Sequence, residues 1–494
     1  MPISHEQHCD TLITNAIVLD GSGANGIVQD VAIRGDKILA VGNLSKACAD
    51  NIIDATGLVL APGFIDVHTH DDLEVIRNPD MLAKISQGVT SVIVGNCGIS
   101  ASPYVNDVTP PDPINLLGNK DEFIFPTLAA YIAQIKATPP AVNVVALVGH
   151  TALRAQVMSE LDRAASTEEV LAMAKILRGA LEQGAKGLSS GLAYKNAHAS
   201  PTAEVAALAA ELAEFDAIYT THLRTEFDGI LGALDEAFSV GRKAKVPVVI
   251  SHLKCAGKHN WGRAKEIINH IKDAQQSQKI ACDCYPYNAS SSTLDLNQVT
   301  DDFDIFITWS DSYPEQAGQI LAEIANQWQL SLHDTALKLQ PAGAVYHGMN
   351  EADVQEIITL PNSMIGSDGL PCDPHPHPRL WGSFPRVLGH YSRDLQLLPL
   401  ATAVHKMTGL SATEFQLTSR GFIKVGYYAD IVLFDPLTIK DTASFTSPFE
   451  ISTGIEKVWV NGQLTYQVGT NRSLAQPVRA GRFLAHIPAP LEDA

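Results

Sequence analysis

APGFIDVHTH, residues 61–70, is the stretch of sequence that decides the fold, because an apolar run ends there in two histidines one residue apart. Side chains alternate across a β-strand, so we expect His68 and His70 to point to one side of a strand, and Val67 and Thr69 to the other. Two imidazoles at the end of a strand form half of a metal site. Taken alone, the pair fits a hydrogen-bonded, metal-free arrangement equally well.

Seven further strand-like segments alternate with helical segments along the chain. A capping box at residues 166–169 precedes one helical stretch, and Pro201 takes the first helical position of another. After the first strand at 64–70, the strand-like segments are residues 89–94, 142–149, 187–190, 218–222, 246–252, 280–286 and 364–368. Eight strand–helix units predict an α/β fold, a TIM-like (β/α)₈ barrel with insertions.

Short β segments also lie at both ends of the chain, outside the alternating region. Residues 429–436 and 457–469 are rich in β-branched and apolar residues, and Asn461-Gly462 is a hairpin signal. The spacing between the seventh and eighth strands is unusually long. We therefore expect a small β-sandwich built from residues 1–61 and 425–494, a barrel at 62–424, and an insertion or lid within the barrel at about 290–345.

Four more residues with metal-binding or proton-transfer side chains fall at the ends of predicted barrel strands. They are Cys97, His222, His252 and Asp368, after the second, fifth, sixth and eighth strands. The carboxyl ends of barrel strands meet at one rim, so we expect these groups to join His68 and His70 there. Imidazole, thiolate and carboxylate together suit Zn²⁺. The sequence therefore predicts a metal-dependent enzyme.

Composition limits the class of protein further. The chain of 494 residues has a formal charge of −19 and is 46% hydrophobic, which excludes wholesale disorder. With no basic run, a nucleic-acid or anionic-membrane partner is not expected. Seven scattered cysteines indicate a reducing compartment, and no signal peptide or spanning segment is found, so we expect a cytoplasmic protein. The sequence does not indicate the oligomeric state.

The motifs and their order resemble those of a known family. APGFIDVHTH after an N-terminal β segment is similar to the amidohydrolase superfamily. VGNCG (94–98), THLR (221–224), SHLKCAG (251–257) with WGRA downstream, and GSDG (366–369) resemble the N-acyl-D-amino-acid deacylase, or D-aminoacylase, family. The resemblance covers nearly the whole chain. It implies zinc-dependent hydrolysis of small N-acyl-D-amino acids to a carboxylate and a free D-amino acid.

The resemblance also implies roles for individual residues. One tightly bound zinc would be held by Cys97, His222 and His252, with His68 and His70 at a second, weaker metal position. Asp368 would be the catalytic acid and base, and the substrate carboxylate would be gripped by Tyr194, Lys254 and Arg379.

Features of the residues themselves support the substrate-binding set. Lys254 follows His252 by two positions, which places both on one face if the strand continues that far. Arg379 lies just beyond Asp368, and guanidinium groups suit carboxylates. Tyr285 and Ser291, near the end of the seventh strand, are further candidates for substrate contact. For other conspicuous residues, such as His150, His375, His377 and the pair Cys282 and Cys284, structural or solvated roles are the simpler interpretation.

Two alternatives stay open at this point. Hydantoinase-like and dihydroorotase-like cyclic amidases bridge two metals with a carboxylated lysine on the fourth strand. Here that strand reads AKGLSSGLAY (185–194), with Lys186 at the wrong end, which favours the deacylase. A barrel kept only for binding would not need to retain all of the candidate ligands. The preferred side chain and the acyl group cannot be derived from the sequence.

Overall fold

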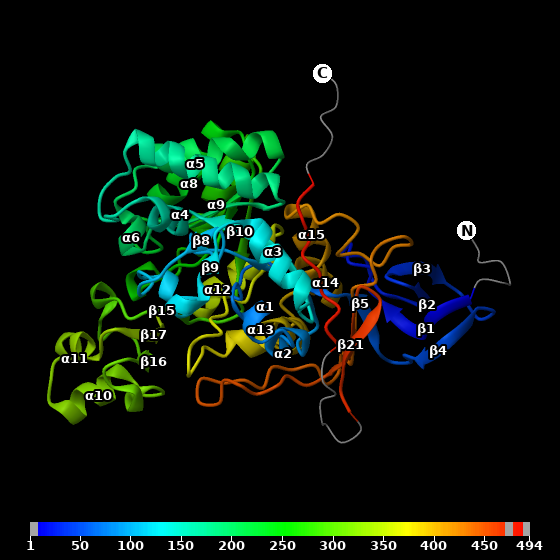
Figure 1. Cartoon of the computed structure of the whole chain (residues 1–494). Helices are drawn as coiled ribbons and strands as arrows, with labels where there is room; N and C mark the ends of the chain where they lie inside the picture. Colours follow the sequence, from blue (N-terminus) through cyan, green and yellow to red (C-terminus); the bar gives the residue numbers. More distant parts are fainter. Residues whose placement is uncertain (1–7, 470–477, 488–494) are drawn as a thin grey trace.

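The computed structural model describes residues 8–469 and 478–487, so the outermost ends of the expected β-sandwich lie outside the described residues. A barrel surrounded by helices forms the larger part of the molecule, and a β-sheet lies against one end of it (Figure 1). No described helix is long and apolar enough to cross a membrane.

Eight parallel strands form the barrel wall, which confirms the predicted fold class. In spatial order they are β6 (Phe64–Asp66), β7 (Val89–Val94), β10 (Asn143–Gly149), β11 (Gly187–Gly191), β12 (Ile218–His222), β13 (Val248–Ile250), β14 (Ile280–Cys284) and β18 (Ser363–Ile365). The ends of β6 and β18 complete the ring, because Asp368 N donates to His68 O at 2.7 Å and His70 N donates to Gly369 O at 3.1 Å.

Several strands end earlier than the sequence suggested. We expected the first, sixth and eighth strands to reach His70, His252 and Asp368, but they end at Asp66, Ile250 and Ile365. His252 and Asp368 have positive φ values of 36° and 48°, which a strand cannot contain. These side chains therefore lie on turns at the rim.

Because the first strand ends early, the expected orientation of its last side chains is wrong. Val67 does not face the helices; it packs in the barrel interior with Ile65, Ile93 and Met364. Strict alternation stops where β6 ends at Asp66, and the backbone then bends. Both histidines still reach the rim of the barrel by this bend.

Helices cover the outside of the barrel. Ser166 and Glu169 form the expected capping box of α5 (Thr167–Glu182). Pro201 occupies the N-cap of α7 (Thr202–Ala209), one position earlier than expected. The other described α-helices outside the insertion are α1 (Glu74–Arg77), α2 (Leu82–Ile85), α3 (Leu128–Ala137), α4 (His150–Val157), α6 (Lys195–His198), α8 (Ile230–Ala244), α9 (Ala264–Gln275), α12 (Glu351–Thr359), α13 (Arg379–Arg386), α14 (Leu400–Met407) and α15 (Gly409–Glu414).

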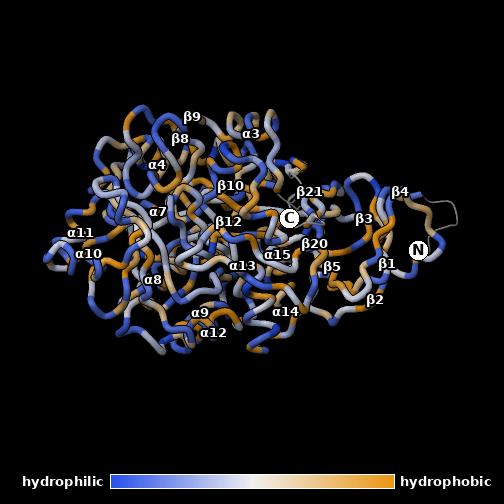
Figure 2. Tube along the Cα trace, turned by 90° about the horizontal axis from the view of Figure 1, so that it is seen from below, coloured by the Kyte–Doolittle hydropathy of each residue, from blue (hydrophilic) through white to orange (hydrophobic). Residues whose placement is uncertain are grey.

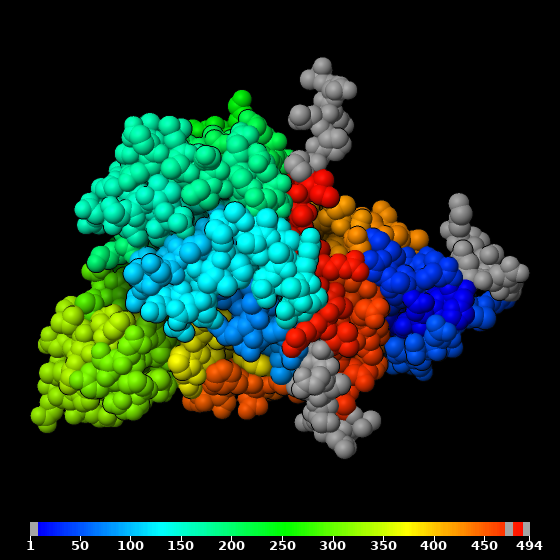
Figure 3. Space-filling view, in the orientation of Figure 1, coloured from blue at the N-terminus to red at the C-terminus, as the bar shows by residue number. Residues whose placement is uncertain are grey.

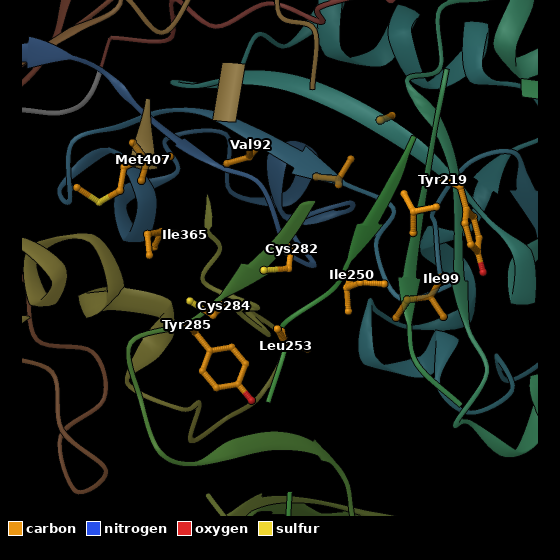
Figure 4. Packing of buried hydrophobic residues seen from close by; sticks show 14 of the residues in the cluster. Val92, Ile99, Tyr219, Ile250, Leu253, Cys282, Cys284, Tyr285, Ile365 and Met407 are labelled. Carbon is orange, nitrogen blue, oxygen red and sulfur yellow. The ribbon is translucent and has the colours of Figure 1, made fainter. Parts of the chain in front are cut away.

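The strand side chains that face the helices form the main hydrophobic core. Figure 4 shows Val92, Tyr219, Ile250 and Ile365 from different strands within this cluster. Cys282 and Cys284 of β14 belong to the same cluster, so these two cysteines are packing residues, as expected. All seven cysteines are free thiols.

The two ends of the chain build one mixed β-sheet. Its strands, in spatial order, are β21 (Gln463–Gln467), β20 (Ile455–Val460), β19 (Ile431–Phe434), β5 (Val59–Pro62), β1 (His8–Val18), β2 (Ile27–Arg34) and β3 (Lys37–Gly42), with β4 (Cys48–Asp54) also on β1. Asn461 and Gly462 have positive φ, as the predicted hairpin turn requires. Figure 2 shows this sheet beside the barrel, with hydrophobic stretches along β1 and β5. The exact domain boundaries stay a prediction.

The expected insertion between the seventh and eighth barrel strands is present. It contains a three-stranded antiparallel sheet with its own hydrophobic core, which also holds two helices. These elements are β15 (Ser290–Thr293), β16 (Ile305–Ser310), β17 (Ala342–Tyr346), α10 (Leu321–Trp328) and α11 (Leu332–Leu339). A short hairpin of β8 (Tyr104–Val105) and β9 (Ile124–Phe125) lies elsewhere on the barrel.

Candidate metal and substrate site

The loop after β7 presents a cysteine at the rim. Cys97 has φ 53°, between Gly95 and Gly98 at 80° and 78°. Ser189 of β11 holds this loop, because its Oγ accepts from Gly98 N at 3.0 Å and donates to Gly95 O at 2.5 Å. Asp72 also accepts from Gly95 N, at 3.2 Å. A left-handed non-glycine residue held from two sides is the type of backbone strain found at functional sites.

The predicted ligand groups come together around Cys97. Its Sγ lies 3.1 Å from His68 Nε2 and 3.3 Å from His252 Nε2. Asp368 Oδ1 lies 3.4 Å from His68 Nε2 and 3.1 Å from His70 Nε2. The candidate ligand atoms of His68, Cys97, His252 and Asp368 all lie within 4.8 Å of one another, and all four residues are buried.

His222 approaches the same centre from β12. Its ring centroid lies 4.4 Å from that of His252, and its ligand atom belongs to a second group with His252 and Glu226. All six candidate ligand or acid–base residues therefore converge on one place, although they come from five separate strand ends.

The electrostatics favour ionised ligands. Burial alone would raise the pKa of the Cys97 thiol, but the adjacent His68 and His252 imidazoles hold it well below its usual range. Burial would likewise raise the pKa of Asp368, but Arg379 and His68 keep it well below the usual value for a carboxyl. A thiolate and a carboxylate are thus favoured beside the histidines.

The donor set fits a zinc ion. Nitrogen, thiolate sulfur and carboxylate oxygen are the ligand types that zinc takes. Within residues 8–469 and 478–487, the Nδ1 atoms of His70 and His222 are buried and have no hydrogen-bond partner. Buried polar atoms without partners are rare, so these two histidines are incompletely satisfied by the protein alone.

Two carboxylates that the sequence did not predict contact the Nδ1 atoms of the histidines, on the side away from the Cys97 sulfur. Asp283 Oδ1 lies 3.2 Å from His68 Nδ1 and accepts from His252 N at 2.9 Å. Glu226 Oε1 lies 2.9 Å from His252 Nδ1. Neither belongs to a recognisable motif: Asp283 lies between two packing cysteines, and Glu226 lies in a loop whose course follows only from the folded structure.

The predicted substrate clamp lies beside this centre. Arg379 Nη1 lies 2.9 Å from Asp368 Oδ2, and Lys254 Nζ lies 2.5 Å from Glu226 Oε1. The Tyr285 ring centroid lies 4.6 Å from Arg379 Cζ and 5.6 Å from Lys254 Nζ. β13 ends before His252, but Lys254 still lies beside it, with Nζ 2.7 Å from His252 Nδ1.

The other two predicted substrate residues are also close. The Tyr194 ring centroid lies 4.8 Å from that of His222. Ser291 accepts from Arg379 Nη2 at 3.1 Å through its backbone carbonyl, while its Oγ is buried and has no partner in the described part of the chain. The structure thus places every predicted site residue in one connected region.

Several histidines that attract attention in the sequence are not among the candidate ligands. His150 pairs with Glu204 at 3.0 Å in the helical layer. His375 Nε2 lies 2.6 Å from Phe445 O, and His377 Nε2 lies 3.1 Å from Ala289 O. Nε2 of each histidine makes a structural contact, as the simpler interpretation predicted for His150. His377 is buried, although a solvated position was expected, and its Nδ1 accepts from Arg379 N at 2.9 Å.

The fourth strand has no space for a bridging side chain. A Cβ atom on Gly191, at the rim end of β11, would lie only 2.1 Å from Cys97 O. Lys186 precedes the opposite end of the strand, where its Nζ lies 2.7 Å from His486 Nδ1. The cysteine loop therefore fills the position that a strand-four lysine would need.

Comparisons with known proteins agree with this geometry. The amidohydrolase family model matches residues 51–285 and 319–466. The chain is 46% identical to D-aminoacylase of Alcaligenes xylosoxydans xylosoxydans over 99% of its own length and 100% of that protein. The chain belongs to the D-aminoacylase family of amidohydrolases.

Other members of the D-aminoacylase family give the same result. The N-acyl-D-aspartate deacylase of Alcaligenes xylosoxydans xylosoxydans is 46% identical over 92% of this chain and 91% of that protein. A crystal structure of N-acyl-D-glutamate deacylase from Bordetella bronchiseptica superimposes with a TM-score of 0.92 at 41% identity, and it covers 97% of this chain and 100% of that one. That protein is complexed with zinc and a phosphonate inhibitor that mimics the tetrahedral intermediate.

Proposed function

We propose that this D-aminoacylase family member hydrolyses the amide bond of N-acyl-D-amino acids with zinc as its resident metal. The observation that carries the proposal is that two groups of side chains lie next to each other at one rim of the barrel. One is the buried group of Cys97, histidines and Asp368, and the other is a pair of buried cations, Lys254 and Arg379, suited to a carboxylate. Membership of a family of linear-amide hydrolases supports the same reaction.

The proposal assigns the metal ligands residue by residue. Cys97, His222 and His252 would hold the zinc, and His68 and His70 would line a second, weaker position. When bound, zinc polarises a carbonyl group and lowers the pKa of water to about 7.

Asp368 is the proposed acid and base. Its carboxyl is ionised because its pKa is well below the usual range, so it can accept a proton from the attacking water. The same carboxyl then passes a proton to the departing amine, which leaves as the free D-amino acid.

The carboxylate clamp would select the D configuration. Tyr194, Lys254 and Arg379 would grip the α-carboxylate, which fixes the face of the chiral carbon that meets the reacting groups. Arg379 pairs here with Asp368, so a substrate carboxylate that takes over the guanidinium would free Asp368 for proton transfer. Tyr285 and Ser291 would line the bound substrate.

The test is amine release by the purified, zinc-replete protein from paired N-acetyl-D- and N-acetyl-L-amino acids with acidic and apolar side chains. Turnover of the D series alone is expected, and the same panel identifies the preferred side chain. Turnover of hydantoin-like or dihydroorotate-like rings, with none of either linear series, would instead identify a cyclic amidase.

A cytoplasmic location and the absence of a nucleic-acid partner stay predictions. The free state of all seven thiols supports a reducing compartment. Cell fractionation with an antibody to the native protein would test the location.

A further inference from the structure

Glu226 lies where the metal ligands and the substrate clamp meet. It follows the end of β12 by four residues, and its side chain is only 12% exposed. Oε1 lies 2.9 Å from His252 Nδ1 and 2.5 Å from Lys254 Nζ, while Oε2 lies 4.0 Å from His222 Nε2. One carboxylate oxygen thus contacts one member of each group.

The two nitrogens of the His252 ring have different surroundings. Nε2 faces the Cys97 sulfur at 3.3 Å, so Nε2 is the nitrogen available to a metal. A histidine that binds a metal through one nitrogen carries a proton on the other and donates it to an acceptor. On the Nδ1 side, Glu226 Oε1 is the carboxylate within reach.

Lys254 needs the same carboxylate for a different reason. Its Nζ lies 2.7 Å from His252 Nδ1, so two hydrogen-bond donors would face each other if His252 carried its proton there. Glu226 Oε1 can accept from both and hold them side by side. Without it, the ammonium group and the imidazole would separate, and both would lose their orientation.

We propose that Glu226 is a positioning residue that couples the metal centre to the carboxylate clamp. It fixes the ring of His252 and the direction of Lys254 through a single oxygen. The inference rests on the proposed function, in which zinc is the metal and Lys254 contacts the substrate.

A direct ligand role is the competing interpretation, because Glu226 groups with His222 and His252 within 4.8 Å. The geometry favours positioning. The contact of Glu226 is on the Nδ1 side of His252, while the sulfur faces Nε2.

The chain offers a matched control in Glu204. This carboxylate is also buried and also joins a histidine to a cation: Oε1 lies 3.0 Å from His150 Nε2 and 2.5 Å from Arg154 Nη1. It lies on α7 in the helical layer and contacts none of the proposed ligands. Its replacement removes a buried carboxylate from a histidine and a cation without touching the proposed metal ligands.

The experiment measures the zinc affinity of the full-length protein by chelator competition, with kcat and KM recorded in parallel. For Glu226→Ala we expect zinc to bind about 10- to 100-fold more weakly. Glu226→Gln keeps an acceptor oxygen for His252, so its zinc affinity should recover most of this loss. Its KM should still rise about tenfold, because Lys254 loses a charge-assisted hydrogen bond. Glu204→Gln should leave zinc affinity unchanged.

Three outcomes would overturn the proposal. Unchanged zinc affinity in folded Glu226→Ala would show that Glu226 does not position His252 for zinc binding. Equal weakening by Glu204→Gln would show a general loss of stability. A near-complete loss of zinc from both Glu226 variants, with an altered visible spectrum of the cobalt-substituted Glu226→Gln protein, would make Glu226 a ligand.

Two further results keep the test decisive. If Glu226→Ala does not fold, Glu226→Asp replaces it, because a carboxylate shortened by one methylene withdraws from His252 Nδ1 and should weaken zinc in the same direction. A wild-type protein that binds zinc but hydrolyses no N-acyl-D-amino acid would contradict the proposed function and leave the zinc comparison valid.

Discussion

The two ends of the barrel both bury charged and polar side chains, but the types of side chain and their pairing differ. At the carboxyl ends of the strands, Arg379 Nε and Ser291 Oγ are buried and have no hydrogen-bond partner among the described residues. At the opposite end, Arg420 pairs with Asp430 and donates to Asn461 at 2.9 Å, while Asn143 donates to Asp430 at 3.1 Å.

The difference separates structural burial from functional burial. This network at the opposite end joins the barrel to the β-sheet, and Figure 3 shows C-terminal residues between the barrel and the N-terminal strands of the sheet. At the rim, three residues with left-handed backbone, Cys97, His252 and Asp368, are the same residues whose ligand atoms cluster within 4.8 Å. Backbone strain at residues whose ligand atoms cluster identifies the end at which a ligand is expected.

Replacing Asp368 by alanine should abolish most of the catalytic activity and leave zinc binding intact. We expect kcat to fall by about 10²- to 10⁴-fold, the usual contribution of acid–base catalysis. Zinc content should be unchanged, because the proposed zinc ligands Cys97, His222 and His252 are all retained. Steady-state kinetics with metal analysis measures both. An Asp368→Ala enzyme of normal activity would refute the assigned role.

Replacing Asp430 by alanine should have the opposite effect, with a loss of stability and little change in activity. It leaves the buried guanidinium of Arg420 without its carboxylate, and breaking a buried ion pair costs about 3–5 kcal/mol. Urea unfolding should show this loss, while kcat per folded molecule stays near the wild-type value. A loss below about 1 kcal/mol, or a selective loss of kcat, would contradict the contrast between the two ends.

The sequence predicted most of the rim because its residues are chemically distinctive. Cysteine, histidine and aspartate after strand-like runs indicate a ligand site wherever the exact strand ends lie. It could not predict Glu226 and Asp283, because their roles depend on which side chains meet across separate strands. The expected strand ends were too late for a related reason. Local β propensity continues past Ile250, but ligand geometry requires a left-handed turn at His252.

Gly191 offers a finer test of how the rim is built. A Cβ at this position would lie 2.1 Å from Cys97 O, so Gly191→Ala should push the cysteine loop away from β11. We expect zinc to bind about tenfold more weakly, the lower end of what support of a metal ligand contributes. Gly179→Ala is the control, because a Cβ on this α5 residue meets nothing within 4 Å and should stabilise the helix by about 0.5–1 kcal/mol. Zinc affinity equal to wild type in Gly191→Ala would show that the loop has other space to occupy.

The smallest expected effect concerns the end of the barrel opposite the rim and its pH dependence. His486 Nε2 lies 2.7 Å from Phe215 O, and its Nδ1 lies 2.7 Å from Lys186 Nζ, so the ring must be neutral to accept from the lysine. Burial and the Lys186 charge lower the pKa of His486, whereas an unfolded histidine titrates near 6.5. Below about pH 6.5 the unfolded chain therefore binds more protons, and the free energy of unfolding falls as the pH decreases. Urea unfolding measures the free energy of unfolding at pH 7.5 and 5.5. Its decrease between these pH values should be smaller in His486→Gln than in the wild type by about 1 kcal/mol, which is the contribution of one hydrogen bond. An equal drop in both proteins would mean that protonation of His486 does not control the stability of this end of the barrel.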